Sequence, residues 1–210
     1  MKKTESFLLG ALLSFSGGLQ DAYTYNVRGR VFANAQTGNV VLMSQNLMSG
    51  QWIRGLYYLC PLVCFALGVF AAEQIESRRK TNWQKPVLVI EILTLALVGF
   101  LPQGLDNFAN MLVSFSCAMQ VQAFRIVKGY GYASTMCIGN LRSGTESLSQ
   151  YLRTGDREAL RKAAHLFGII LVFAIGAGLG GILSGVAGIR TIWVCPAILS
   201  AAAIIMADSK

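Results

Sequence analysis

The feature that most constrains this chain is a succession of long apolar runs, joined by short links that hold most of the charged residues. Each run approaches the roughly 20 residues that a helix needs to cross a bilayer. Only 13% of the residues are charged and 54% are hydrophobic, whereas soluble domains carry about 25% charged residues. The sequence therefore predicts an all-α integral membrane protein with a single membrane domain, residues 1–210.

Six of the apolar runs predict transmembrane helices. They cover residues 6–25, 57–72, 86–101, 107–124, 164–183 and 192–206. The first run follows Lys2 and Lys3, as the apolar part of a signal peptide would. No small-residue cleavage site closes the apolar stretch that begins at Phe7, and Asp21 follows that stretch, so we expect an uncleaved first membrane helix.

Two further segments, residues 31–48 and 134–152, are interrupted by polar residues. The first contains Asn34-Ala35-Gln36-Thr37-Gly38-Asn39, and the second contains Thr135-Met136-Cys137-Ile138-Gly139-Asn140. Matching Gly38 to Gly139 sets an offset of 101 residues, which also places Asp21-Ala22-Tyr23 on Gln122-Ala123-Phe124. This echo predicts an internal repeat, with one unit at about 5–102 and the other at about 106–207.

Polar backbone interrupted by glycine is tolerated at membrane depth only where it is buried in protein or lines a cavity. We therefore expect both segments to be broken or re-entrant helices, with Thr37 as the N-cap of a half-helix that starts near Gly38. The alternatives are that both are turns at the membrane surface, or that both cross the membrane and give eight spans.

The distribution of Lys and Arg favours six spans over eight. With two re-entrant segments, Lys2, Lys3, the cluster at 78–85 and the cluster at 153–162 all fall on the cytoplasmic side, and the turn at 102–106 carries no positive charge outside. Both termini are then cytoplasmic, and Arg28, Arg30 and Arg54 are left outside. The two units have opposite orientations, which predicts an inverted repeat.

Ionisable and amide side chains inside apolar runs are the candidates for a solute site. We predict that substrate-binding residues come from Gln20, Asp21, Thr37, Gly38, Asn39, Glu91, Gln122, Gly139 and Asn140. Three alternatives stay open: Asp21 can be a helix cap, Glu91 can be hydrated near the interface, and the amides can be hydrogen-bonding links between helices.

Other classes of function find little support. The net charge of +8 lies in short clusters between apolar runs, so we expect no nucleic-acid partner. The five cysteines and the single His165 show no metal-ligand spacing, and no nucleophile can be matched with a base. We therefore expect no metal, no cofactor and no enzyme activity.

The run 164–183 carries Gly176, Gly180 and Gly181, a small-residue spacing that lets helices approach closely. It can serve packing between the two units of one chain, which we favour, or association of two chains. We expect the lipid bilayer, and in the second case a homodimer, as partners.

Two motifs carry a family resemblance: Gly17-Gly18-Leu19-Gln20-Asp21-Ala22-Tyr23 and Val31-Phe32-Ala33-Asn34-Ala35-Gln36-Thr37-Gly38-Asn39-Val40. They resemble the signature of the YoaK-type family of bacterial multi-span membrane proteins, a domain of unknown function, and the resemblance covers nearly the whole chain. Ile138-Gly139 stands where similar sequences often read Thr-Gly. The resemblance implies a multi-span helical fold in the bacterial inner (cytoplasmic) membrane and no established activity.

From the residues themselves we predict a small-solute transporter or channel with a midplane site between the two Gly-Asn segments. Asp21 and the amides suit a cationic or polar neutral solute better than an anion. The alternative function is a non-transporting membrane scaffold or stress-associated accessory protein.

Overall fold

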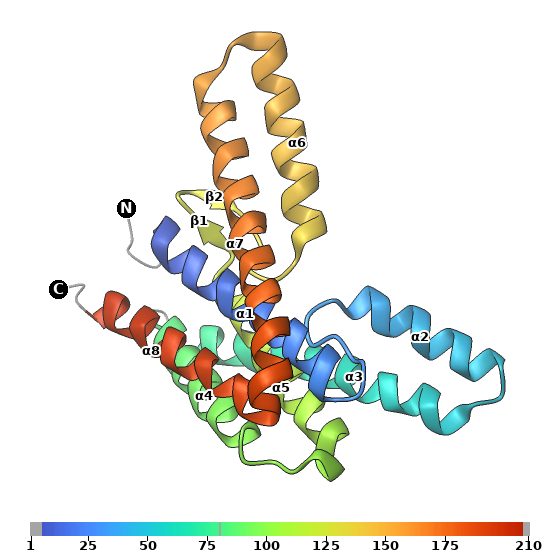
Figure 1. The fold of residues 1–210 in the computed structure, drawn as a ribbon. Coiled ribbons are helices and arrows are strands. Elements are labelled where there is room, and N and C mark those ends of the chain that lie inside the picture. The colour runs from blue at the N-terminus through green and yellow to red at the C-terminus, as the bar shows by residue number, and fades with distance from the viewer. Residues whose placement is uncertain (1–5, 80, 208–210) are drawn as a thin grey trace.

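The computed structural model describes residues 6–79 and 81–207. Lys2, Lys3 and Lys80, on which part of the topology prediction rests, lie outside these ranges. The described chain is helical apart from one short hairpin, which confirms the prediction of an all-α protein (Figure 1). Its helices are α1 (Phe7–Val27), α2 (Gln36–Met48), α3 (Trp52–Arg78), α4 (Gln84–Val98), α5 (Asp106–Ala123), α6 (Cys137–Thr154), α7 (Arg157–Ala187) and α8 (Val194–Ala207), with single 3₁₀ turns η2 (Gln103–Leu105) and η3 (Gly188–Trp193).

Two helical stretches are long and apolar enough to cross a membrane: Trp52–Arg78, and Arg157–Ala207, which runs through α7, η3 and α8.

Capping residues explain where several of the helices begin and end. Ser6 accepts the Leu9 N–H at 3.2 Å to start α1, and Asp156 accepts the Glu158 N–H at 2.9 Å to start α7. Gly155, with φ of 70°, ends α6 in the left-handed region that favours glycine.

Helices α1 and α7 run parallel and pack backbone to backbone. A Cβ atom at Gly176 would collide with the Phe15 carbonyl, and one at Gly180 would lie 2.9 Å from the Leu19 Cα. The predicted close packing of the glycine-rich run is thus confirmed, with a helix of the first half of the chain as its neighbour. Helices α3 and α5 pack in the same manner, where Gly68 lies against the Phe115 carbonyl.

A buried arginine joins the ends of α1, α4 and α5. The Arg28 side chain forms an ion pair with Asp106 at 2.9 Å and donates to the carbonyls of Val98, Leu101 and Pro102 at 3.1, 2.8 and 3.2 Å. Its Nε donates to the Tyr23 hydroxyl at 2.7 Å. Arg28 therefore stands at this end of the bundle because it holds helix ends together.

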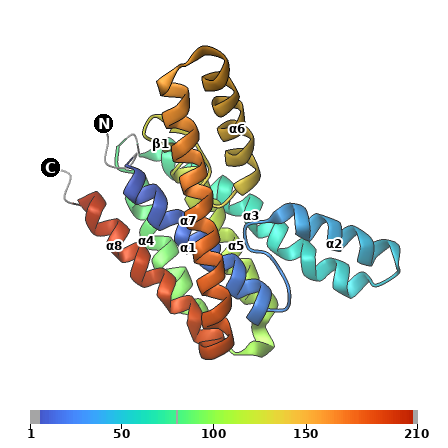
Figure 2. The ribbon, with the colours of Figure 1, turned by 45° about the horizontal axis from the view of Figure 1, so that its top comes forward.

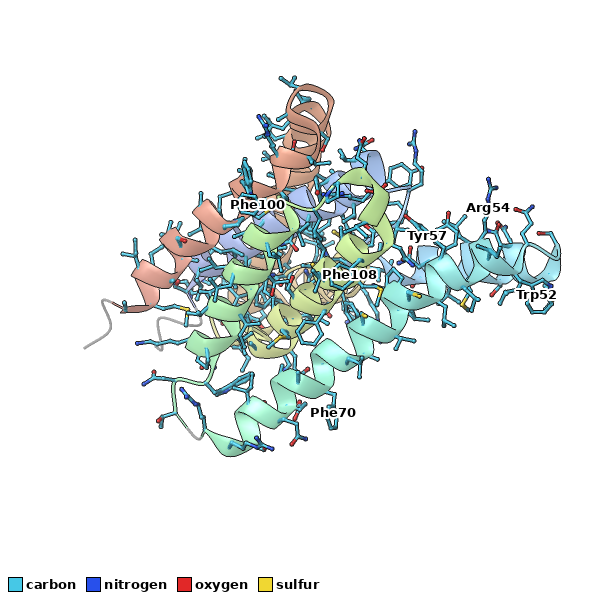
Figure 3. The ribbon with its side chains drawn as sticks, turned by 90° about the horizontal axis from the view of Figure 1, so that it is seen from below. Trp52, Arg54, Tyr57, Phe70, Phe100 and Phe108 are labelled. Carbon is cyan, nitrogen blue, oxygen red and sulfur yellow. The ribbon has the colours of Figure 1, made fainter. Side chains whose placement is uncertain are left out.

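Many large apolar side chains are exposed on the outside of the helices. Figure 3 shows Phe70 pointing away from the bundle, and Phe70 and Phe100 are among its most exposed large side chains. The same view places Trp52 and Arg54 at the far end of the α2–α3 hairpin, well outside the bundle.

The sequence analysis did not predict the hairpin of β1 (Ile126–Val127) and β2 (Tyr130–Gly131). Lys128 and Gly129 join the strands with φ of 53° and 84°, the two positive values that a tight two-residue hairpin turn requires. A single Lys-Gly pair without alternating apolar flanks gave too weak a signal.

Candidate functional site

Helices α2 and α6 both begin at the middle of α1. The Asn34 amide, just before α2, donates to the Gly17 carbonyl at 3.1 Å. Thr135, just before α6, packs against the same Gly17 so closely that no Cβ would fit there. Figures 1 and 2 show α2 and α6 leaving this region in different directions. The positive N-terminal ends of two helices therefore meet inside the protein.

Each of these helices returns toward the end of the molecule from which its segment came. The Tyr57 hydroxyl, in the second turn of α3, donates to the Arg28 carbonyl at the end of α1 at 3.0 Å. In the second half, the Tyr130 hydroxyl of the β-hairpin donates to Glu158 at the start of α7. Each segment therefore starts and ends near the same place in the protein.

The two predicted Gly-Asn pairs build identical turns. Asn39 donates to the Phe32 carbonyl at 2.7 Å and accepts the Phe32 N–H at 3.2 Å. Asn140 donates to the Ala133 carbonyl at 2.7 Å and accepts the Ala133 N–H at 3.0 Å. Each asparagine thus ties its helix to the extended residues that precede it, and its amide is used for structure.

A cavity of about 940 Å³ opens where the two helix starts meet. Its walls come from both halves of the chain. Residues 34–37 and 135–138 contribute the two helix starts, and Asp21, Ala22, Tyr25, Phe32, Leu62, Phe65, Ala66, Phe173 and Ala177 complete the lining. The wall is mostly apolar and aromatic, with a few polar groups gathered at the helix starts, as is typical of small-molecule sites.

Asp21 is committed to the start of α2. Its Oδ1 accepts the Asn34 N–H at 2.7 Å, and the side chain is buried at the cavity wall. A carboxylate at a helix N-terminus is stabilised by the unpaired N–H groups there. Asp21 thus holds the residues that lead into α2, and it does not cap its own helix.

Of the predicted site residues, only Asp21 and Thr37 line this cavity. Thr37 lies inside the first turn of α2, which begins at Gln36 after Ala35 and has no side-chain cap, so the prediction of Thr37 as the N-cap is wrong. Gly38 and Asn39 lie in the first turn of α2, and Gly139 and Asn140 lie in the first turn of α6, where the asparagines bind the preceding backbone.

Gln20 and Glu91 form a separate buried group inside the bundle. The Gln20 amide donates to the Ser16 hydroxyl at 3.0 Å and to Glu91 Oε1 at 3.4 Å, and the Cys117 thiol donates to Gln20 Oε1 at 2.7 Å. Glu91 is fully buried, which contradicts the alternative of a hydrated interfacial side chain. Gln122 is distant from this group and donates to Glu73 at the end of α3.

Within α1 and α5, the buried polar residues match at an offset that is one residue smaller than the offset of the Gly-Asn pairs. Buried serines and glutamine of α1 recur in α5 at an offset of 100 residues, as Ser14, Ser16 and Gln20 with Ser114, Ser116 and Gln120. The offset of 101 holds for the turns. Asp21 therefore corresponds to Val121 and not to Gln122, so the second half lacks an acid at this place.

Four of the cavity-wall residues that sequence reasoning missed are aromatic: Tyr25, Phe32, Phe65 and Phe173. Phe65 and Phe173 come from the middles of α3 and α7, where nothing distinguishes them from lipid-facing residues. Asn34 and Thr135 stood in the quoted motifs, and their flanking position before each helix was the signal that could have found them.

Comparison with known proteins places this geometry in a family. A family profile described as "Protein of unknown function (DUF1275)" matches residues 9–205. The chain belongs to this family. It is also similar to the UPF0700 transmembrane protein YoaK of Bacillus subtilis (strain 168), with 25% identity over 180 residues, 80% of this chain and 79% of that protein. No solved structure gives a significant match.

These matches confirm the resemblance to the YoaK-type family. Together with the apolar helices, the name of the relative supports a transmembrane protein. The description of the DUF1275 family assigns no activity, so the function has to be argued from the site.

Proposed function

We propose that this DUF1275 protein is a small-solute membrane transporter or channel whose site is the cavity between the starts of α2 and α6. The observation that carries the proposal is the meeting of two helix N-termini, from the two halves of the chain, at one cavity beside the middle of α1. Paired interrupted helices at the midplane are the recurrent binding architecture of secondary transporters.

An inverted repeat supports the proposal. Asp106 at the start of α5 pairs with Arg28 at the end of α1, while Gln120 near the end of α5 approaches the Leu13 carbonyl at 3.4 Å, so α1 and α5 run antiparallel. Helix α7 runs parallel to α1. Helix α3 runs parallel to α5, because Gln122 donates a hydrogen bond to Glu73 and Arg125 forms an ion pair with Glu76. The first half of the chain is thus oriented opposite to the second.

The proposed topology has six spans, α1, α3, α4, α5, α7 and α8, with α2 and α6 re-entrant. The start of α1 and the end of α8 lie at the same end of the bundle (Figures 1 and 2). The clusters around Arg78 and Arg157 lie at the ends of helices that point there, which makes this end cytoplasmic by the positive-inside rule. The family resemblance implies that the membrane is the bacterial inner membrane.

The hydrogen bond that Asp21 accepts bears on the class of solute that the cavity binds. Because this carboxylate already accepts an N–H at the start of α2, it gives less reason for a cation than the sequence alone suggested. Of the two solute classes expected, the polar neutral one fits this cavity better.

Uptake into proteoliposomes tests the proposal. The reconstituted protein should admit at least one member of a panel of amino acids, sugars, polyamines, nucleobases and ions. Ala35→Trp, at the cavity wall, should stop that uptake because the indole takes up space inside the cavity.

Leu105→Trp is the matched control, because Leu105 is exposed and lies away from the cavity. It should leave uptake unchanged. If no solute enters, or if Ala35→Trp transports as well as the unaltered protein, transport through this cavity is refuted. That result would favour the alternative of a non-transporting membrane scaffold.

A further inference from the structure

The outer face of α6 carries charged side chains that residues 6–79 and 81–207 leave uncovered. Arg142 and Glu146 form an ion pair at 3.0 Å, while 80% and 61% of their side chains stay exposed. Thr145, Ser149 and Arg153 lie on the same face of the helix and are exposed as well. These five residues make up the charged face of α6.

The opposite face of α6 packs on α7. Gly144 lies against the Phe167 ring, where an added Cβ would be 2.9 Å from Cε1. Asn140 and Ser147, on the same side as Gly144, are buried. Figures 1 and 2 show the α6–α7 hairpin extending away from the other helices. The charged face is therefore directed away from the only helix that α6 follows along its length.

The charged face starts deep in the proposed membrane domain. Helix α6 begins at Cys137, shortly after Thr135, which packs against Gly17 at the middle of α1. At about 1.5 Å per residue, Arg142 lies within about 8 Å of this helix start and Glu146 within about 14 Å. Half of a hydrocarbon core is about 15 Å thick. The proposed topology thus places both charged groups below the membrane surface.

Charged side chains at this depth are too costly to face lipid, and they lie instead in a protein interior or a water-filled space. A hollow of about 540 Å³ lies along the charged face, lined by residues of α6 from Ile138 to Arg153. Ile138 also lines the cavity between the two helix starts. The hollow and the cavity therefore adjoin at the first turn of α6.

The equivalent face of α2 carries no charge. Four pairs of residues, 101 positions apart, define the two faces: Val40 with Leu141, Val41 with Arg142, Ser44 with Thr145, and Gln45 with Glu146. All of these side chains are exposed. Because α2 starts at Gln36 and α6 at Cys137, both members of a pair lie at the same distance from their helix start. The two halves thus differ in charge at matched positions.

We infer that the charged face of α6 lines a water-filled entrance that leads from the cytoplasm to the cavity, while the matching face of α2 faces lipid. Water in this entrance solvates the Arg142–Glu146 pair, and a polar solute can reach the cavity through it without crossing lipid. This inference rests on the proposed transport function and topology, since it names the route to the same cavity.

The reactivity of single cysteines on the two faces tests the inference. Leu141→Cys and Thr145→Cys report on α6, and Val40→Cys and Ser44→Cys are their matched controls on α2. These side chains are exposed, so their replacement removes little packing. The background is the full-length chain with its partly exposed cysteines changed to serine: Cys60, Cys64 and Cys137. Variants are compared when their thermal unfolding matches that of the background chain, and two positions on each face make the comparison independent of any one variant.

The reagent is a charged, membrane-impermeant methanethiosulfonate. It is added to inside-out vesicles to reach the cytoplasmic side and to spheroplasts to reach the outer side. Because the thiolate is the reactive form and needs water, the α6 thiols should react from the cytoplasmic side at least about tenfold faster than the α2 thiols react from either side. After unfolding in sodium dodecyl sulfate, the thiols of both faces should react alike.

Any result in which the α6 thiols do not react faster from the cytoplasmic side overturns the inference. A second copy of the chain packed on α6 would give slow reaction on both faces, and a wet surface on both helices would give fast reaction on both.

The outcome is separable from the test of transport. If a solute enters proteoliposomes and Ala35→Trp stops it, while the α6 thiols react no faster than their α2 partners, this entrance fails and transport stands. If the α6 thiols react from the cytoplasmic side as expected but no solute enters, the water-filled entrance stands and transport fails.

Discussion

Arg28 shows at the residue scale how one buried cation can hold several helix ends. Every N–H of its guanidinium has an acceptor in the structure: a hydroxyl, a carboxylate and three carbonyls near the end of α4. A lysine offers one point of charge and cannot reach these acceptors together. The residue is therefore a structural requirement that charge counting alone misplaces as a topology signal.

Replacing Arg28 with methionine should destabilise the folded protein by about 3–5 kcal/mol, because Asp106 and the carbonyls lose their partner in a buried site. Arg28→Lys should recover only part of this loss. Thermal unfolding in detergent measures both, with Arg54→Met as the control, since Arg54 is exposed and donates to the nearby Gln51 side chain at 3.3 Å. An equal, small effect of Arg28→Met and Arg54→Met would contradict the proposed role.

The asparagine clamps give a second prediction at this scale. Asn39→Leu and Asn140→Leu should each lower stability, because each leaves one backbone N–H and one carbonyl without their bonds, at about 1–3 kcal/mol for each buried group. Asn46→Leu is the control, since its amide donates only to the Leu42 carbonyl within the same helix. A variant of Asn39 that stays as stable as the unaltered protein but loses solute binding would make Asn39 a ligand and not a clamp.

At the scale of elements, the α1–α7 contact depends on glycine at particular turns. Gly176→Ala should destabilise the protein by about 1–3 kcal/mol, because its Cβ would collide with the Phe15 carbonyl and force the helices apart. Gly178→Ala is the matched control two residues on. It meets open space and should be neutral or stabilising, as alanine is the better helix former.

Thermal unfolding of the two glycine variants distinguishes helix packing from general helix propensity. If Gly176→Ala were as stable as Gly178→Ala, the contact with α1 would not be limiting. Loss of a dimer without loss of monomer stability would instead favour the alternative use of these glycines between two chains.

The elements were more predictable from the sequence than their contacts. Apolar runs located the bundle helices because length and composition are local properties. The starts of α2 and α6 were located because glycine and amides are conspicuous in an apolar chain. Phe65 and Phe173 could not be assigned to the cavity, since only packing between distant helices separates a cavity wall from a lipid-facing side. Gln20 and Glu91 were recognised as unusual, but their grouping with Cys117 depends on how α1, α4 and α5 cross.

At the scale of the whole molecule, the two halves of the chain build the starts of α2 and α6 in similar but not identical ways. Each half brings a helix start to the middle of α1, and each uses an asparagine to fix the preceding turn. Only the first half supplies a carboxylate for its helix start, through Asp21. The two helix starts at the cavity therefore differ in whether a carboxylate lies beside them.

The re-entrant path makes a prediction about sidedness that the eight-span alternative does not share. In the proposed topology Ser49, after α2, and Gln103, after α4, lie on the outer side, while Lys128 of the β-hairpin lies on the cytoplasmic side. All three are exposed.

Single cysteines at these positions, in a background with Cys60, Cys64 and Cys137 changed to serine, should therefore react differently with a membrane-impermeant maleimide. Ser49→Cys and Gln103→Cys should be labelled in intact spheroplasts, and Lys128→Cys only after the membrane is opened. If α2 and α6 crossed the membrane completely, Ser49→Cys would be labelled from the side opposite to the end of α1. A probe at Asn26→Cys, in the last turn of α1, reports the side on which α1 ends. Labelling of Asn26→Cys and Ser49→Cys from opposite sides would thus refute re-entrance, and with it the meeting of two helix starts inside the membrane on which the proposed site depends.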